Sequence, residues 1–351
     1  MSARKKPIRV LIVDDSALVR RILAEGIRTD PELQVVGEAS NPYMARDMMV
    51  ELKPDVITLD VEMPRMDGVT FLKRFMPIMP IPTIIISSLT QKDAMISLAA
   101  LESGAVDVIA KPVMGIMDDL PKMREMINQR IKIAASANIE HFKNSTVRKD
   151  IDTVAHLGET TDKVIALGSS TGGVEALVRI LPAFPANAPG MVIVQHMPKG
   201  FTTSFSERLN NLCKMQVKEA AQGDRILPGH IFLAPGGSQH TIIERSGGQY
   251  KIALIEGDPV NYSRPSVDVL FKSVANIVGV NAAAAVLTGM GKDGAQGLLE
   301  IRQAGGFTVV QDQASCVVFG MPQVAHQLGG AKHMVPLEQI PALLMTAFKR
   351  K

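Results

Sequence analysis

The chain has 351 residues, of which 46% are hydrophobic and 21% are charged, and its formal net charge is +3. This length and composition predict two globular domains and exclude a disordered or fibrous chain. The net charge is small and Lys and Arg are scattered along the chain, so electrostatics gives no reason to expect nucleic-acid binding.

Two cysteines, Cys213 and Cys316, are too few for a disulfide framework, and no Cys/His cluster has the spacing of metal ligands. No apolar stretch approaches the ~20 residues needed to cross a bilayer. The apolar run after the basic N-terminal residues is short and ends at Asp14, which is typical of a buried strand and not of a signal peptide. We therefore expect a cytoplasmic protein with no direct membrane insertion.

Short apolar segments alternate with helical patterns in the first part of the chain. The expected strands are Ile8–Val13, Val35–Ala39, Val56–Leu59, Thr83–Ile86 and Val106–Ala110. The expected helices are Ala17–Ile27, Met44–Leu52, Ala94–Leu101 and a last one near Met117–Arg130. Apolar strands separated by amphipathic helices predict a doubly wound parallel sheet with both faces covered.

Charged and hydroxyl side chains follow the strands of this predicted sheet. Asp14 and Asp15 end the first strand, Asp60 ends the third, Ser87 follows the fourth and Lys111 follows the fifth. Each alone is more often a helix cap or a loop residue, but parallel strands bring all of them to one edge. Carboxylates that converge raise one another's pKa unless a cation lies between them, and oxygen ligands suit Mg²⁺. This pattern predicts a phosphoryl-transfer site in which a carboxylate attacks the donor.

These motifs resemble a response-regulator receiver domain over about Arg9–Arg130. The matching segments are Val13–Ser16, Leu59–Pro64, Asp67–Gly68 and Lys111–Pro112. The resemblance implies a flavodoxin-like fold in which Asp60 accepts phosphate from a histidine kinase. It further implies that Ser87 and Lys111 contact the phosphoryl group.

The same resemblance implies a Mg²⁺ site formed by Asp15, Asp60 and the Glu62 carbonyl, with Asp14 nearby. Receivers commonly carry an aromatic switch residue three positions before the lysine, and here that residue is Val108. Signalling through an aromatic ring flip is therefore not expected, whereas phosphorylation is.

A second strand–helix alternation begins at Val164, after a stretch rich in Ala, Ser, Thr, Asn and Lys. The predicted organisation is a receiver at 8–126, a linker at 127–160 and a larger α/β catalytic domain at 161–351, also with a doubly wound parallel sheet. The expected strands are Val164–Leu167, Met191–Val194, Ala283–Leu287 and Phe307–Val310, with a hairpin of Gln239–Glu244 and Tyr250–Ile255. The expected helices are Val174–Leu181, Ser266–Val278 and Ala295–Ala304.

The first strand of this domain runs into Gly168–Gly173, which reads Gly-x-Ser-x-Gly centred on Ser170 and precedes a helix. This is the pattern of a nucleophile elbow. Gly-rich turns also bind phosphates, but the Gly-x-Gly-x-x-Gly spacing and the Walker lysine are absent here. His196 and Asp293 follow two other strands, so they are the candidate base and orienting acid.

Other histidines and aspartates compete for these two roles. His230, His240 and His326 lie in segments that read as loops or surface, and Asp258 and Asp268 read as turn or helix-surface residues. We therefore favour the combination of Ser170, His196 and Asp293.

The second half resembles the catalytic domain of the chemotaxis protein-glutamate methylesterases. The matching segments are Gly168–Gly173, Gln195–Pro198, Leu227–Gly229, Arg264–Asp268, Leu287–Gly294 and Ser315–Pro322. The resemblance implies Ser170 as nucleophile, His196 as base and Asp293 as orienting acid. It also makes the Met290 amide a candidate oxyanion donor and places Thr171 close to the nucleophile. Ser263 stands where relatives can have histidine, so no substrate role is assigned to its loop.

Together the two resemblances imply a phosphorylation-activated hydrolase for sensory adaptation. It would demethylate glutamate methyl esters, and deamidate specific glutamines, on methyl-accepting chemotaxis receptors. A chemotaxis histidine kinase would be the phosphodonor, Mg²⁺ would serve the receiver and no cofactor would serve the catalytic domain. The fusion predicts that the unphosphorylated receiver blocks access of receptors to the esterase.

Three other functions compete with this interpretation. A binding module with an inactive catalytic domain is disfavoured by the complete set of triad candidates. A DNA-binding output is disfavoured because the C-terminal region shows no compact basic helix-turn-helix pattern. A general lipase or peptidase stays open on residue chemistry alone, because an elbow motif does not name a substrate.

Overall fold

The chain is described as a computed structural model that covers residues 6–88, 90–111, 120–139 and 162–348. It divides into two compact units, residues 1–148 and 149–351, and each is described by itself. Within the residues covered, no helix is both long and apolar enough to span a bilayer.

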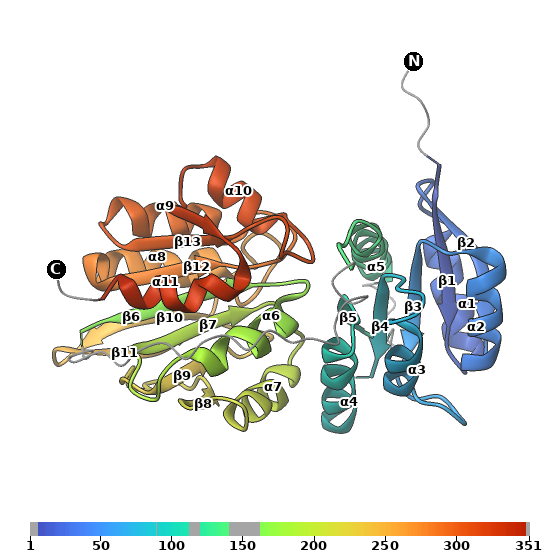
Figure 1. The fold of residues 1–351 in the computed structure, drawn as a ribbon, viewed down its shortest axis with the longest axis horizontal. Helices are drawn as coiled ribbons and strands as arrows, with labels where there is room; N and C mark the ends of the chain where they lie inside the picture. Colours follow the sequence, from blue (N-terminus) through green and yellow to red (C-terminus); the bar gives the residue numbers. More distant parts are fainter. Residues whose placement is uncertain (1–5, 89, 112–119, 140–161, 349–351) are drawn as a thin grey trace, which may run out of the picture. The chain divides into compact units, whose positions relative to one another are not determined.

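The first unit contains a parallel sheet with strand order β2-β1-β3-β4-β5 (Figure 1). Its strands are β1 (Ile8–Val13), β2 (Leu33–Ala39), β3 (Val56–Asp60), β4 (Thr83–Ser87) and β5 (Asp107–Ala110). Its helices are α1 (Ala17–Ile27), α2 (Pro42–Leu52), α3 (Gly68–Phe75), α4 (Gln91–Glu102) and α5 (Leu120–Ala135). Helices α1 and α5 contact each other, as do α3 and α4, and right-handed crossovers place the two pairs on opposite faces. The predicted doubly wound sheet is confirmed.

Two features of this unit differ from the sequence expectation. Helix α3 was not expected; Asp67 caps it by accepting from the Thr70 amide. Helix α5 continues to Ala135, past the predicted domain boundary at residue 126, because Ile127 and Ile131 are buried and keep the helical period. The rest of the predicted linker, from residue 140, and the start of the expected last helix near Met117 lie outside the described residues.

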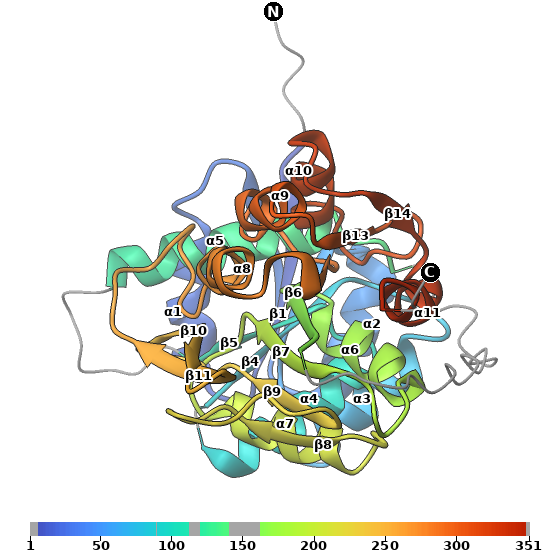
Figure 2. The same cartoon turned by 90° about the vertical axis from the view of Figure 1, so that its left-hand side faces the viewer.

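The second unit contains a larger parallel sheet with strand order β14-β13-β12-β6-β7-β9-β8 and a separate hairpin (Figure 2). The strands of the sheet are β6 (Val164–Ser169), β7 (Gly190–Gln195), β8 (Gln216–Glu219), β9 (His230–Leu233), β12 (Ala282–Val286), β13 (Phe307–Gln311) and β14 (His333–Val335). The hairpin pairs β10 (His240–Ser246) with β11 (Gln249–Ile255) around Gly247 and Gly248, which confirms the expected hairpin. Every residue of the central strands β6, β7 and β12 is buried, and these strands are apolar except for the polar residues Ser169 and Gln195 that end β6 and β7.

Helices cover both faces of this sheet. They are α6 (Gly173–Ile180), α7 (Phe201–Asn210), α8 (Val267–Ile277), α9 (Ala295–Gln303), α10 (Met321–Gln327) and α11 (Ile340–Thr346), with short 3₁₀ turns at Leu181–Ala183, Gly279–Asn281 and Leu337–Gln339. Helices α8, α9 and α10 and the hairpin form one continuous core with one face of the strands. Helices α6, α7 and α11 lie on the other face (Figures 1 and 2).

The elements that the sequence analysis missed in this unit are short or polar. Strand β8 has exposed Gln216 and Lys218 alternating with buried Val217, and it lies at the edge of the sheet. Helix α7 is rich in Thr and Ser, of which the buried Thr202 and Ser206 donate hydrogen bonds, so its apolar stripe is weak. Local apolar periodicity identifies the four long central strands and fails for the short strands β8, β9 and β14.

Substituting Gly168 with Ala is expected to destabilise the second unit. Gly168 lies on the central strand β6, where an added Cβ would collide with the methyl groups of Val267 at the start of α8. We expect the free energy of unfolding to fall by about 1–3 kcal/mol, measured by urea denaturation followed by circular dichroism. Gly257→Ala is the control, because its Cβ would meet only the His240 ring at 3.3 Å, and it should cost much less.

Candidate functional site

The carboxylate of Asp293 lies at the N-terminus of α8 and accepts hydrogen bonds from several segments. Its donors within the chain are Ser266 Oγ (2.7 Å), Val267 N (2.7 Å), Asp268 N (3.1 Å), Asn261 Nδ2 (3.1 Å) and His196 Nε2 (2.9 Å). Burial alone would raise the pKa of Asp293, but the hydrogen bond and charge of His196, with Ser266 and Val267, outweigh it and hold the pKa below its usual value. Asp293 is therefore a buried anion suited to orient an imidazole.

His196 follows β7 and joins this carboxylate through Nε2. A carboxylate only accepts hydrogen bonds, so Nε2 carries the proton and Nδ1 is left as the acceptor. Ser263 Oγ lies 3.3 Å from Nδ1 and donates to it. The ring therefore offers Nδ1 as its basic atom, the reverse of the serine-protease arrangement, in which Nδ1 faces the aspartate.

Ser170 lies in the turn between β6 and α6, with Gly172 in the left-handed conformation at φ 77°. The Ser170 amide donates to the Thr288 carbonyl at 3.0 Å, and its carbonyl accepts from Gly173 N at 2.7 Å. Strands β6 and β7 are neighbours, so Ser170 and His196 follow adjacent strands. Among the described residues, the His196 ring bonds to Asp293 and Ser263, and no hydrogen bond joins it to Ser170 Oγ.

The buried side chain of Gln195 ties the two strand ends together. Its Nε2 donates to the Ser170 carbonyl (2.9 Å) and to the His196 carbonyl (3.1 Å), and its Oε1 accepts from Ser169 Oγ (2.6 Å). An added Cβ on Gly173 would collide with that Oε1, so only glycine at this position leaves space for the Gln195 side chain. Gln195 was not singled out from the sequence, although it lies in the matching segment Gln195–Pro198.

The loop after β12 lies against Ser170. An added Cβ on Gly289 would be 2.8 Å from Ser170 Cβ, so the two residues are in close contact. Met290, whose amide is the candidate oxyanion donor, follows directly, and its side chain is 48% exposed. Thr171 is buried, and its carbonyl accepts from Thr288 Oγ1 at 3.0 Å.

One competing histidine differs from expectation. His240 is 2% exposed, not a surface residue, because it begins β10 and accepts from the Ser266 amide through Nδ1 (3.1 Å) while its Nε2 bonds to the Asp258 carbonyl (2.9 Å). Asp268 accepts from Gly297 N and Asn261 Nδ2, and burial and then the charge of Asp293 raise its pKa. His240 and Asp268 thus each contact a donor to Asp293: His240 contacts Ser266, and Asp268 contacts Asn261.

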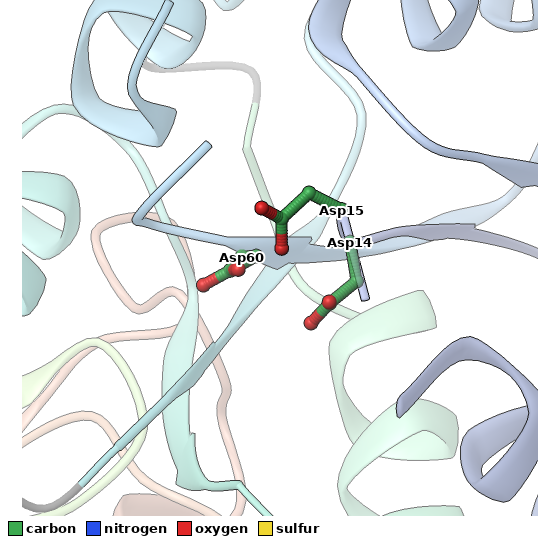
Figure 3. Close-up of side chains that lie close together, drawn as sticks. All are labelled: Asp14, Asp15 and Asp60. Carbon is green, nitrogen blue, oxygen red and sulfur yellow. The ribbon is translucent and has the colours of Figure 1, made fainter. Parts of the chain in front are cut away.

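The first unit gathers its acidic residues where the strand order reverses, between β1 and β3. Carboxylate oxygens of Asp14, Asp15 and Asp60 lie within 4.8 Å of one another (Figure 3). Asp14 and Asp60 are buried, whereas Asp15 is exposed. Lys111 Nζ lies 2.7 Å from Asp60 Oδ2 and 3.3 Å from Asp14 Oδ2. Ligands of open α/β sheets bind at such a reversal point.

One lysine does not offset the charge of this cluster. Burial, then repulsion from Asp14, raises the pKa of Asp60 to about 6, although the hydrogen bond and charge of Lys111 oppose the rise. Burial likewise raises the pKa of Asp14. A set of oxygen donors that resists ionisation and opens to solvent at Asp15 fits a hydrated divalent cation such as Mg²⁺.

The remaining predicted receiver residues lie around this cluster. The Glu62 amide donates to Asp60 Oδ1 at 3.2 Å, and its exposed carboxylate is not part of the cluster. Ser87 ends β4 and is fully buried, and its carbonyl accepts from the Lys111 amide at 2.7 Å. Val108 is buried in β5.

Comparisons with known proteins agree with this description. Residues 165–344 match the family model of the CheB methylesterase, and residues 10–115 match that of the response regulator receiver domain. A protein-glutamate methylesterase/protein-glutamine glutaminase of Syntrophotalea carbinolica is 53% identical over 339 residues, covering 95% of this chain and 96% of the relative. A second one, from Pseudomonas aeruginosa, is 51% identical and covers 98% of both chains.

A solved structure supports the fold of the second unit. The crystal structure of the Thermotoga maritima CheB methylesterase catalytic domain is 39% identical, covers 52% of this chain and 97% of that one, and has a TM-score of 0.51. Fold and matches together define a response regulator whose second unit is a hydrolase domain. The chain belongs to the protein-glutamate methylesterase/protein-glutamine glutaminase family.

Replacing Asp60 with Asn is expected to stabilise the first unit near neutral pH without divalent cations. Because its pKa is raised to about 6, folded Asp60 holds its proton at pH values where an unfolded aspartate has lost it. Its contribution to stability is therefore greatest below about pH 4 and is lost as pH rises to about 6. The substitution should add roughly 2–3 kcal/mol to the free energy of unfolding at about pH 7.5, and far less at about pH 4.

Urea denaturation at both pH values measures this effect. Asp15→Asn is the matched control, because Asp15 belongs to the same cluster but is exposed, and its gain should be smaller. Equal gains for both variants at both pH values would contradict burial as the cause.

Proposed function

We propose that this protein hydrolyses glutamate γ-methyl esters on chemotaxis receptors and deamidates specific receptor glutamines, under the control of phosphorylation at Asp60. The observation that carries the proposal is the His196–Asp293 pair, which lies beside the Ser170 turn within the segment that matches the methylesterase family. Relatives that match almost the full chain are named for both activities.

The proposed reaction is acyl transfer through Ser170. As Ser170 Oγ attacks the γ-carbonyl carbon, its proton passes to His196 Nδ1, which must exchange Ser263 for Ser170 as its hydrogen-bond partner. Asp293 stays ionised and stabilises the imidazolium. The Met290 amide, next to Gly289 in contact with Ser170, is the proposed donor to the oxyanion, and the Thr171 segment lines the nucleophile.

The tetrahedral intermediate collapses when the ester C–O bond breaks, and methanol leaves with the proton from His196. A water molecule then attacks the acyl carbon and gives one proton to Nδ1, which passes it to Ser170 Oγ as the acyl C–O bond breaks. The product acid loses its remaining proton to solvent and leaves as the glutamate carboxylate. With a glutamine side chain the leaving group is ammonia. Every proton transfer in this sequence uses Ser170, His196 or water, so no metal is proposed for this unit.

Asp60 is the proposed phosphoacceptor of the first unit, with a chemotaxis histidine kinase as donor. Its Oδ2 lies 2.7 Å from Lys111 Nζ, which would neutralise charge on the transferred group, and Ser87 ends the neighbouring strand β4. Asp14, Asp15, Asp60 and the Glu62 carbonyl would hold Mg²⁺, which when bound supplies charge neutralisation for the phosphoryl oxygens.

Ser170→Ala is expected to lower methanol release from methylated receptor membranes by about 10⁴-fold or more, because the nucleophile is lost. Asp293→Asn should also cost several orders of magnitude, since it disturbs the tautomer of His196. Ser169→Ala is the matched control. The buried Ser169 hydroxyl donates to Gln195 and takes no part in the proposed reaction, so the loss of methanol release should be far smaller. Release that is unchanged in Ser170→Ala would mean that the nucleophile is misassigned.

A small-molecule phosphodonor with Mg²⁺ is expected to raise methanol release by the wild type and not by Asp60→Asn. The same assay tests whether the unphosphorylated receiver blocks receptor access, because a chain that lacks residues 1–150 should then have raised basal release. Stimulation that persists in Asp60→Asn would contradict Asp60 as the phosphoacceptor. Unchanged basal release after deletion would contradict the blocking model.

A further inference from the structure

A tight turn at Val260–Ser263 lies beside the proposed catalytic residues. Val260 and Ser263 exchange two backbone hydrogen bonds, of 3.1 and 3.0 Å, and the central residues Asn261 and Tyr262 have φ values of 50° and 64°. Positive φ at both central positions is typical of a type I′ turn, which favours Asn followed by Gly. Here a tyrosine occupies the position at which glycine is preferred.

The backbone conformation of Tyr262 costs energy, and the residue adds nothing to the hydrophobic core. A bulky residue in the left-handed region is strained, and backbone strain of this kind clusters at ligand-contacting sites. Tyr262 is 103% exposed, so its ring gains nothing from burial within the second unit. Tyr250, by comparison, is 9% exposed within the core. A contact that the ring makes outside the fold of this unit would offset that cost.

The turn is attached to the proposed catalytic residues on both sides of Tyr262. Asn261 Nδ2 donates to Asp293 Oδ1 and to Asp268 Oδ2, at 3.1 and 2.8 Å. Ser263 Oγ contacts His196 Nδ1 at 3.3 Å. These two anchors fix the backbone on both sides of the exposed Tyr262 next to the proposed catalytic residues.

Two other partly exposed apolar residues lie on the segments that meet at Asp293. Val260, in the turn, is 36% exposed, and Met290, in the loop that carries Asp293, is 48% exposed. An exposed aromatic ring and partly exposed apolar residues on two segments that meet at Asp293 suit a peptide segment with apolar side chains next to the reacting residue.

We propose that Tyr262 is a specificity-determining contact for the receptor segment that flanks the methylated glutamate. The inference rests on the proposed function and deepens it, because it assigns binding of the polypeptide to a residue outside the triad. Tyr262 takes no part in proton transfer; its ring packs on the receptor segment and helps to hold the ester at Ser170.

The test compares two substrates of the full-length, phosphodonor-treated protein: methylated receptor membranes and a small N-acylated glutamate γ-methyl ester. For each variant, the ratio of kcat/KM on the receptor to kcat/KM on the small ester is measured. We expect Tyr262→Ala and Tyr262→Gly to lower this ratio by about tenfold or more, as for truncation of an aromatic contact residue. Tyr262→Phe keeps the ring and should keep the ratio.

Two further measurements separate contact from folding. Tyr262→Gly removes the strain at φ 64°, so its thermal midpoint should equal or exceed that of the wild type while its receptor turnover falls. Val280→Ala is the matched surface control, since Val280 is 73% exposed on the same unit, and it should leave the ratio unchanged.

An unchanged ratio in Tyr262→Ala would overturn the inference. If that unchanged ratio came with an equal loss on both substrates, the turn would only support the triad. A wild type that hydrolyses neither ester would overturn the proposed function, and this inference with it. A wild type active on both esters, together with an unchanged ratio in the variant, would overturn the inference alone.

Discussion

The hydrogen bonds accepted by Asp293 are the interaction on which the second unit's site depends. They join the end of β7, the Val260–Ser263 turn, the start of α8 and the loop after β12 through one buried carboxylate. A carboxylate buried without donors would take up a proton and lose its hold on the imidazole. Because the amides of α8 point at it, the charge is stable, and helix packing and catalytic geometry are thereby coupled. Gly168, which admits Val267 close to β6, belongs to the same arrangement.

The two units use buried carboxylates in opposite ways. Asp293 is surrounded by donors, and its pKa is lowered, so it remains an anion and orients His196. Asp60 has Lys111 as a cationic partner but lies beside Asp14, and its pKa is raised to about 6. A carboxylate that is poorly compensated gains from the arrival of a cation or from esterification, whereas a fully compensated one does not. This difference agrees with a proposed phosphoacceptor in one unit and a proposed orienting acid in the other.

Both sites lie where the strand order of a parallel sheet reverses. In the first unit this point is between β1 and β3, and in the second it is between β6 and β12. Helices leave the sheet toward opposite faces there, and the carboxyl ends of the strands are open to a ligand. The same rule therefore positions Asp14 and Asp60 in one sheet and Ser170 and Asp293 in the other, although the two sheets differ in size and order.

The sequence by itself determined the class of both sheets, the strands of the first sheet and four central strands of the second, because apolar periodicity and strand ends are local properties. It thus predicted that Asp14, Asp60 and Lys111 lie close together, and likewise His196 and Asp293. The tertiary structure alone decided that His196 faces Asp293 through Nε2 and Ser263 through Nδ1, and that His240 is buried. Those contacts join residues far apart in the chain and depend on side-chain direction, which no local pattern encodes.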